Sequence, residues 1–257
     1  MKASTLTKNK QFIRKLAIIF IWVMVWEWIH HIVGKDILIP SPYATFKKLI
    51  EMMKELGFYY DIFLTFYRVG MGVIISSLLG FGTGLIAYLI KPIQELLEPF
   101  MTLLKSTPVM AVIILALLWF TKNTVPIFVC LLMCYPVVYT NVLKGFQSVD
   151  QELLEMAKTF RVKTFVIVRE LYIPQVKPYL DAALCMIVGL AWKVVVAAEV
   201  LAVPNYSMGY NLLSAKSYLE TETLFAWVVV IVILSSLCES SVKWLLQREN
   251  RQDGEKR

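Results

Sequence analysis

Two charged residues, Lys193 and Glu199, lie inside a long apolar stretch, where ionisable groups are rare. A charge facing lipid there costs ~2.5–3.5 kcal/mol on insertion scales, so such groups usually face other helices or a water-filled path. They are six residues apart in the chain, so on a regular helix they point in roughly opposite directions and are not expected to pair. We expect them to line a path or a gate. The alternative is pairing with a polar group of another helix.

Other reactive residues do not form a recognisable site. The four cysteines, Cys130, Cys134, Cys185 and Cys238, all lie in apolar blocks and include no C-x-x-C pair. The two histidines are not spaced with them as a zinc site requires, so no metal is expected. Glu27, His30 and His31 lie near the end of the first apolar block, where solvation at the membrane surface is favoured over a proton or metal role.

The composition is that of a protein with several membrane spans. Apolar residues make up 58% of the 257 residues, and the mean hydropathy is +0.64. A bilayer core needs about 20 apolar residues per helix. We expect an all-α polytopic protein with spans over about 16–33, 69–90, 108–120, 125–142, 180–203 and 224–246. An amphipathic helix over 43–56 is expected at the membrane surface. Gly80 and Gly84 are four apart, a spacing that lets helices pack closely.

Positive charge indicates the orientation. The net charge is +7, but Lys and Arg gather at the edges of the apolar blocks, which argues against nucleic-acid binding. They concentrate in the N-terminal segment 1–15, in the connection 144–178 and in the tail 247–257. With six spans all three lie on one side, which the positive-inside rule makes cytoplasmic. Both termini are therefore expected in the cytoplasm, with the chain in the cell membrane.

The connection between the fourth and fifth spans contains helical patterns. Residues 150–160 place Leu153, Met156, Ala157 and Phe160 on one apolar stripe, with Asp150 able to cap the start. A second short helix is expected over 163–171, after which Pro174 and Pro178 turn the chain into the fifth span. Such a helical elbow could dock into a partner's groove or lie on lipid headgroups, and the pattern does not choose between them.

This connection resembles the EAA loop of permeases of binding-protein-dependent ABC importers. The family pattern is Glu-Ala-Ala, three residues, Gly, nine residues, Ile-x-Leu-Pro, and here Glu155-Met156-Ala157, Arg161 and Leu171-Tyr172-Ile173-Pro174 have the same spacing. Lys158 lies within this loop. Met156 replaces Ala and Arg161 replaces Gly, so either Arg161 adopts a positive φ at some cost or the bend differs.

Further motifs resemble the nitrate/sulfonate/taurine-type branch of this family. They are Pro40-Ser41-Pro42, Lys105-Ser106-Thr107-Pro108, Gly189-Leu190-Ala191-Trp192-Lys193 and Ala197-Ala198-Glu199, so the resemblance covers about residues 12–246. It places Trp192, Lys193 and Glu199 on the expected translocation path or gate. Lys193 would attract an anionic substrate.

The resemblance implies a single transmembrane domain over residues 1–257 that pairs as a homodimer in membrane lipid. The chain lacks a Walker A sequence, so ATP and Mg are expected on a separate ABC ATPase subunit, with no cofactor on this chain. An extracytoplasmic binding protein would deliver a small anion such as a sulfonate, nitrate or bicarbonate.

Two other function classes are less favoured. An autonomous secondary transporter is disfavoured because only one six-span half is present, without an inverted repeat. An intramembrane enzyme needs clustered reactive groups, for which only Ser235, Ser236 and Lys193 are candidates.

Overall fold

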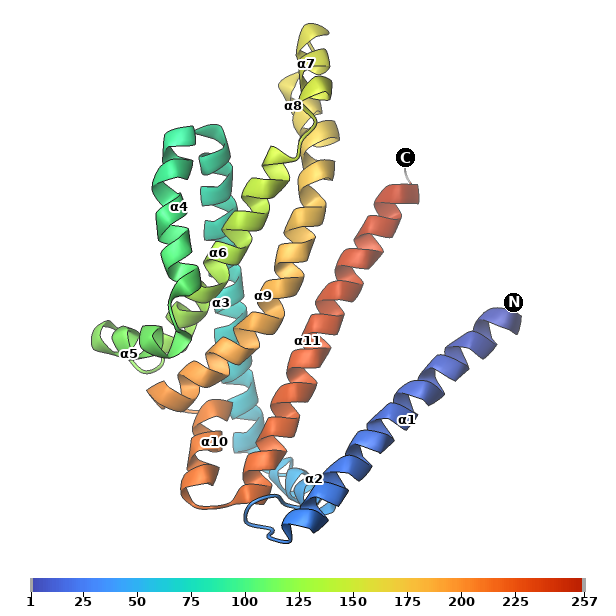
Figure 1. Ribbon diagram of the computed structural model, residues 1–257, viewed down its shortest axis with the longest axis vertical. Coiled ribbons are helices and arrows are strands. Elements are labelled where there is room, and N and C mark those ends of the chain that lie inside the picture. The colour runs from blue at the N-terminus through green and yellow to red at the C-terminus, as the bar shows by residue number, and fades with distance from the viewer. Residues whose placement is uncertain (1, 256–257) are drawn as a thin grey trace. The chain divides into compact units, whose positions relative to one another are not determined.

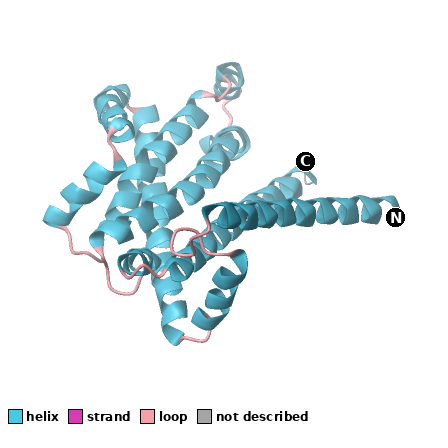
Figure 2. Cartoon of the chain, turned by 60° about the horizontal axis from the view of Figure 1, so that its bottom comes forward, coloured by secondary structure: helices cyan, strands magenta, loops and turns pink. Residues whose placement is uncertain are grey.

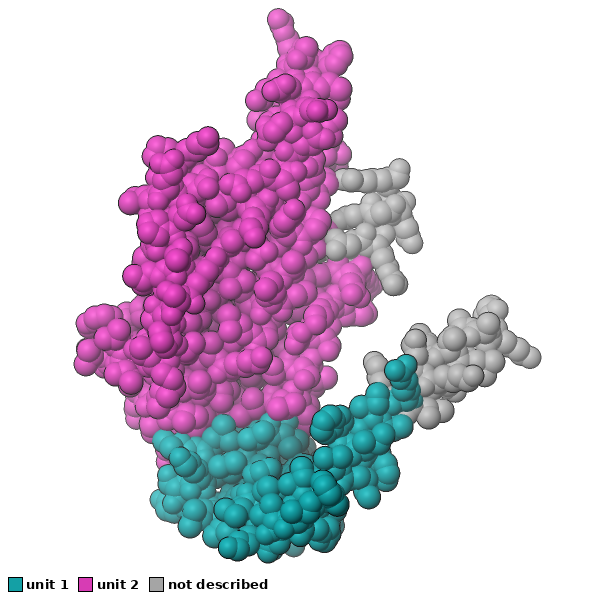
Figure 3. All heavy atoms as spheres, viewed as in Figure 1, with its two compact units in different colours: residues 1–59, 211–230 teal, residues 60–210, 231–257 magenta. Residues whose placement is uncertain are grey.

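Helices and loops make up the described chain. The computed structural model describes the backbone of residues 2–255 and the side chains of residue 14 and residues 17–248. Within this part every regular element is a helix and none is a strand (Figure 2), which confirms the predicted all-α class. The chain divides into two compact units, residues 1–59 with 211–230 and residues 60–210 with 231–257 (Figure 3). The single transmembrane domain stays a prediction.

The first unit contains α1 (Lys2–Val33), α2 (Pro42–Met52) and parts of α3 (Leu56–Leu89), α10 (Met208–Ser217) and α11 (Thr221–Glu255). Its loop between α1 and α2 is held by hydrogen bonds. Trp26 Nε1 donates to the carbonyl of Pro40 at 3.1 Å, and Thr221 Oγ1 donates to that of Ile37 at 2.7 Å. Ser41 begins α2, because its hydroxyl accepts from the Ala44 N–H at 3.1 Å.

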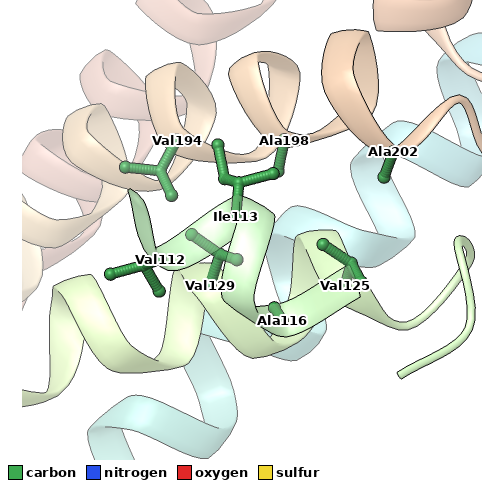
Figure 4. Close-up of a cluster of buried hydrophobic side chains, with 8 residues drawn as sticks. All are labelled: Val112, Ile113, Ala116, Val125, Val129, Val194, Ala198 and Ala202. Atoms are coloured by element: carbon green, nitrogen blue, oxygen red, sulfur yellow. The ribbon is translucent and has the colours of Figure 1, made fainter. Parts of the chain in front are cut away.

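The second unit is organised around α6 (Val125–Gln147) and α9 (Ile173–Ala202), which pack extensively against each other (Figure 1). α5 (Val109–Trp119) packs against both helices, and α4 (Lys91–Ser106) packs against α6. Ile113 of α5 is fully buried among valines and alanines of α6 and α9 (Figure 4). Small β-branched residues allow this close approach without voids.

Small residues on α3 make a similar contact with α6. A Cβ added at Gly80 would lie 2.6 Å from Val138 Cβ, and one added at Gly84 would lie 2.9 Å from Val142 Cγ1. These distances are shorter than any real packing contact, so both glycines sit where the two helices touch. This is the close packing that the four-residue spacing favours.

The predicted span boundaries need three corrections. α3 begins at Leu56 rather than near residue 69. The predicted span 108–120 is only the second half of a broken pair, α4 and α5, bent by 105°. Pro108 keeps Thr107 extended, with ψ 127°, so the helix must end there. Third, α6 continues through Pro136 to Gln147, beyond the predicted end at residue 142, and Thr140 Oγ1 donates to the Pro136 carbonyl at 2.6 Å.

The number of spans is supported only in part. Four described helices are long and apolar enough to cross a bilayer, and the bent pair can supply a fifth. The predicted first span corresponds to a shorter apolar helix, Ala17–Val33. The chain is therefore a multi-pass membrane protein by length and composition, while the count of six is not confirmed.

Candidate functional site

The connection after α6 forms a helical elbow, defined here as residues 150–172, at one end of the second unit. α7 (Gln151–Thr159) begins at Asp150, whose carboxylate accepts from the N–H groups of Glu152 at 2.9 Å and Leu153 at 3.3 Å. The Asp150 N–H in turn donates to Gln175 Oε1 at 3.1 Å. The start of the elbow is thus capped and tied to the first turn of α9.

Arg161 stands at the bend with a left-handed backbone, φ 52°. The N–H of Val162 reaches the Ala157 carbonyl at 2.9 Å, and that of Arg161 reaches Lys158 at 3.0 Å. This hydrogen-bond pair is the Schellman ending, in which the left-handed position is usually glycine. Of the two alternatives given above for Arg161, the structure has the strained backbone rather than a different bend.

Most of the elbow is exposed, and its uncovered side chains include many apolar ones. Leu154 is buried against the second unit, whereas Met156 is 52% and Phe160 76% exposed. The uncovered apolar side chains are Leu153, Met156, Phe160, Val162, Phe165, Val166 and Val168. Glu155 and Lys158 are also exposed, and Ala157 is half-buried. Within the described chain the predicted stripe therefore faces outward, not into the fold.

The second half of the elbow differs from the prediction. A short α8 (Thr164–Ile167) leads into a π-helical turn, η1 (Val168–Tyr172), and then directly into α9. Pro174 and Pro178 lie inside the beginning of α9 and do not break it. The wider π turn, with Ile173 N–H bonded to the Val168 carbonyl, makes room for a proline ring that would otherwise clash one turn back. Leu171 and Pro174 are half-buried, and Ile173 is exposed.

Glu199 is fully buried near the other end of α9 and is satisfied by a polar cluster. Arg68 Nη1 of α3 lies 2.7 Å from Glu199 Oε1 and is itself 4% exposed. Thr65 Oγ1 lies 3.0 Å from both carboxylate oxygens, and the Gly209 N–H donates to Oε2 at 3.1 Å. Buried charges persist when paired and fully hydrogen-bonded in this way.

Arg68 and Gly209 bring the chain after α9 into the same cluster. Arg68 also donates to the carbonyls of Tyr206 at 3.1 Å and Asn205 at 3.0 Å. A Cβ on Gly209 would lie 2.4 Å from Glu199 Cβ, so only glycine fits there. The sequence reasoning missed Arg68 because it placed that residue outside the second span. The available signal was that Arg68, a charged residue, lies within an apolar block of the sequence.

The three predicted path residues lie in different surroundings. Glu199 is enclosed in the ion pair, the alternative left open above. Lys193 is exposed, on a side of α9 near Glu239 of α11. Trp192 is 1% exposed, and its indole N–H has no hydrogen-bond partner among the described residues. Trp192 borders an apolar pocket of about 390 Å³ between α3, α9 and α11.

Metal chemistry has no obvious location in this part of the molecule. Among the residues that the structure describes, no three His, Cys, Asp or Glu side chains gather closely enough to hold an ion. The four cysteines are free, and Cys130 and Cys134 are buried at adjacent turns of α6.

Sequence comparison identifies the family. Residues 72–251 match the family described as binding-protein-dependent transport system inner membrane component. The chain belongs to this family. The predicted family membership is thereby confirmed, and the family supports a role as a translocation subunit.

Relatives agree with the predicted branch. The chain is 27% identical over 232 residues to a putative aliphatic sulfonates transport permease protein of Bacillus subtilis, covering 88% of this chain and 82% of that protein. It is 24% identical over 225 residues to the taurine transport system permease protein of Escherichia coli, covering 85% and 82%.

Solved structures share the fold at low identity. One is a bacterial ABC transporter involved in the import of the acidic polysaccharide alginate, with TM-score 0.67 and 11% identity over 95% of this chain and 98% of that chain. Another is an amino acid ABC transporter with histidines, with TM-score 0.62 and 19% identity over 79% and 98%.

Proposed function

We propose that this chain is the permease subunit of an ATP-driven importer and that the elbow is its docking element for a separate ATPase subunit. The observation that carries the proposal is the uncovered apolar face of the elbow, with Met156 and Phe160 at its centre. A capped, stiff helix with exposed apolar side chains is suited to a partner's groove. ATP and Mg would be held by the ATPase, with no cofactor on this chain.

The elbow is joined firmly to the beginning of α9. Asp150 caps α7, Gln175 ties its start to α9, and η1 continues into α9 without a loop. A displacement of the docked elbow would therefore move the beginning of α9 as well. In energetic terms, the ATPase would shift the balance between inward-facing and outward-facing states.

The remaining assembly follows from the family and its relatives. We infer a homodimer in the lipid of the cell membrane, served by an extracytoplasmic binding protein. The elbow, the segment 1–15 and the tail 247–257 would face the cytoplasm, in agreement with their positive charge. Sulfonate and taurine permeases among the relatives favour a small organic anion as substrate.

Charge reversal on the elbow tests this proposal. Glu155→Lys is expected to uncouple ATP hydrolysis from transport in the reconstituted complex, because an exposed carboxylate on the docking face becomes a cation. Glu51→Lys, an equally exposed site on α2, serves as the matched control and should leave coupling intact. Normal coupling in Glu155→Lys would refute the docking role. Transport by the purified chain without any ATPase would instead establish a secondary transporter.

A further inference from the structure

α4 carries two uncovered faces of opposite character. Its buried face, with Met101 and Leu104, packs within the second unit. One uncovered face is apolar and consists of Leu96, Phe100 and Leu103. The other is polar, called here the α4 polar stripe, and consists of Glu95, Glu98, Thr102 and Lys105. Both sets recur every three or four residues, so each forms a continuous line along the helix.

A bilayer can accept only one of these faces. The apolar face can contact lipid tails, but a line of carboxylates, hydroxyl and ammonium cannot do so without a large cost. α4 is also the first half of the broken span, bent by 105° from α5 at Ser106–Pro108. Broken helices at membrane depth are tolerated where they line a water-filled cavity or are buried in protein. The α4 polar stripe is therefore expected to face water or another subunit.

Lys105 is an exposed cation that bonds a hydroxyl. Its Nζ donates to Thr140 Oγ1 of α6 at 2.7 Å. Among the described side chains, no carboxylate forms an ion pair with it, in contrast to Arg68 with Glu199. Thr102 lies three residues earlier on the same face, and its hydroxyl donates to the Glu98 carbonyl at 3.0 Å.

We propose that the α4 polar stripe lines the translocation path and that the Lys105 ammonium contacts the anionic group of the substrate. A sulfonate or similar oxyanion suits this cation, since an ammonium has three N–H donors and Thr140 Oγ1 accepts from one of them. The proposal rests on the proposed importer function and assigns substrate contact to residues other than Lys193.

Thiol modification in the full complex tests the stripe without relying on transport. Thr102→Cys is treated with sulfonatoethyl methanethiosulfonate, an anion, and separately with the trimethylammonioethyl reagent, a cation. In each case the thiolate attacks the reagent sulfur, forms a mixed disulfide and releases methanesulfinate. Leu103→Cys, on the lipid-facing side, is the matched control, and the parent chain gives the background from its native cysteines.

The expected result has two parts. Cys introduced at 102 reacts, whereas Cys at 103 does not. The anionic-to-cationic rate ratio at 102 then falls about tenfold in Lys105→Met, because a charge one turn away biases the local potential. Lys105→Arg keeps the positive charge and should keep the rate ratio. That result would show that the lower ratio in Lys105→Met comes from the lost charge and not from misfolding.

Two results would overturn the proposal. The first is a Cys at 102 that is as unreactive as the Cys at 103. A Cys at 102 that forms a disulfide between two copies counts as the same result, because it marks a subunit contact. The second is a rate ratio that Lys105→Met leaves unchanged. ATP-coupled transport is measured separately on the parent complex, so the proposed function stands or falls on its own.

Discussion

Removing the Arg68 guanidinium should destabilise the protein strongly. In Arg68→Met, Glu199 loses its 2.7 Å charged partner while remaining fully buried. The Asn205 and Tyr206 carbonyls lose their donors as well. Breaking a buried ion pair by removing one partner costs about 3–5 kcal/mol. Thr65 and Gly209 still bond the carboxylate, which places the expected loss toward the lower part of that range.

The assay is thermal unfolding of the purified protein in one detergent. For a chain of this size each kcal/mol moves the midpoint by about 2–4 °C, so a loss of about 3–4 kcal/mol lowers it by roughly 6–16 °C. Arg169→Met is the matched control, because Arg169 is an exposed arginine whose side chain is 69% accessible. An exposed ion pair contributes little to stability, so the unfolding midpoint of Arg169→Met should barely change.

A double-mutant cycle with Glu199→Gln separates pairing from packing. Glu199→Gln removes the charge but keeps an acceptor for Thr65 and the Gly209 N–H. The double variant should lose clearly less than the sum of the single losses, by about 1–3 kcal/mol, since no unpaired carboxylate is then buried. A midpoint change in Arg68→Met no larger than in Arg169→Met, or strictly additive losses, would refute the reasoning.

Two further substitutions test the backbone assignments. Arg161→Gly should raise stability by about 1 kcal/mol, because glycine adopts φ 52° without the side-chain clash. The gain is measured as a higher unfolding midpoint, and an unchanged or lower midpoint would contradict the strained turn. Gly80→Ala should cost about 1–3 kcal/mol by overpacking against Val138, whereas Gly82→Ala, where an added Cβ meets nothing within 4 Å, should cost nothing; equal midpoints for the two would contradict the α3–α6 contact.

Local features of the elbow were predictable from the sequence. The cap at Asp150 and the outward stripe with Met156 and Phe160 depend on neighbouring residues only. The strained backbone at Arg161 could be stated as one of two alternatives, because the helix has to end there whichever residue is present. The continuous path through η1 into α9 could not be predicted, since proline usually ends a helix and the π turn that admits it has no clear sequence signal.

Features that depend on segments far apart in the chain were not predictable. Glu199 meets Arg68 across 131 positions, and no spacing rule connects them. α4 was also missed as a helix at membrane depth. Its polar stripe lowers the average hydropathy, so a search for continuous apolar runs begins only at α5. The polar residues that hid α4 from this search also make it a candidate for lining the translocation path.

α9 connects these features mechanically. Its 30 residues span about 45 Å as a regular helix, with the elbow at its start and Glu199 near its end. Glu199 is fixed to α3 through Arg68 and to the start of α10 through Gly209, so that end resists displacement. The elbow end contains the π turn and Pro178, where the helical hydrogen-bond ladder is weakest. A force applied at the elbow is therefore expected to bend α9 near its beginning and leave the Arg68–Glu199 pair intact.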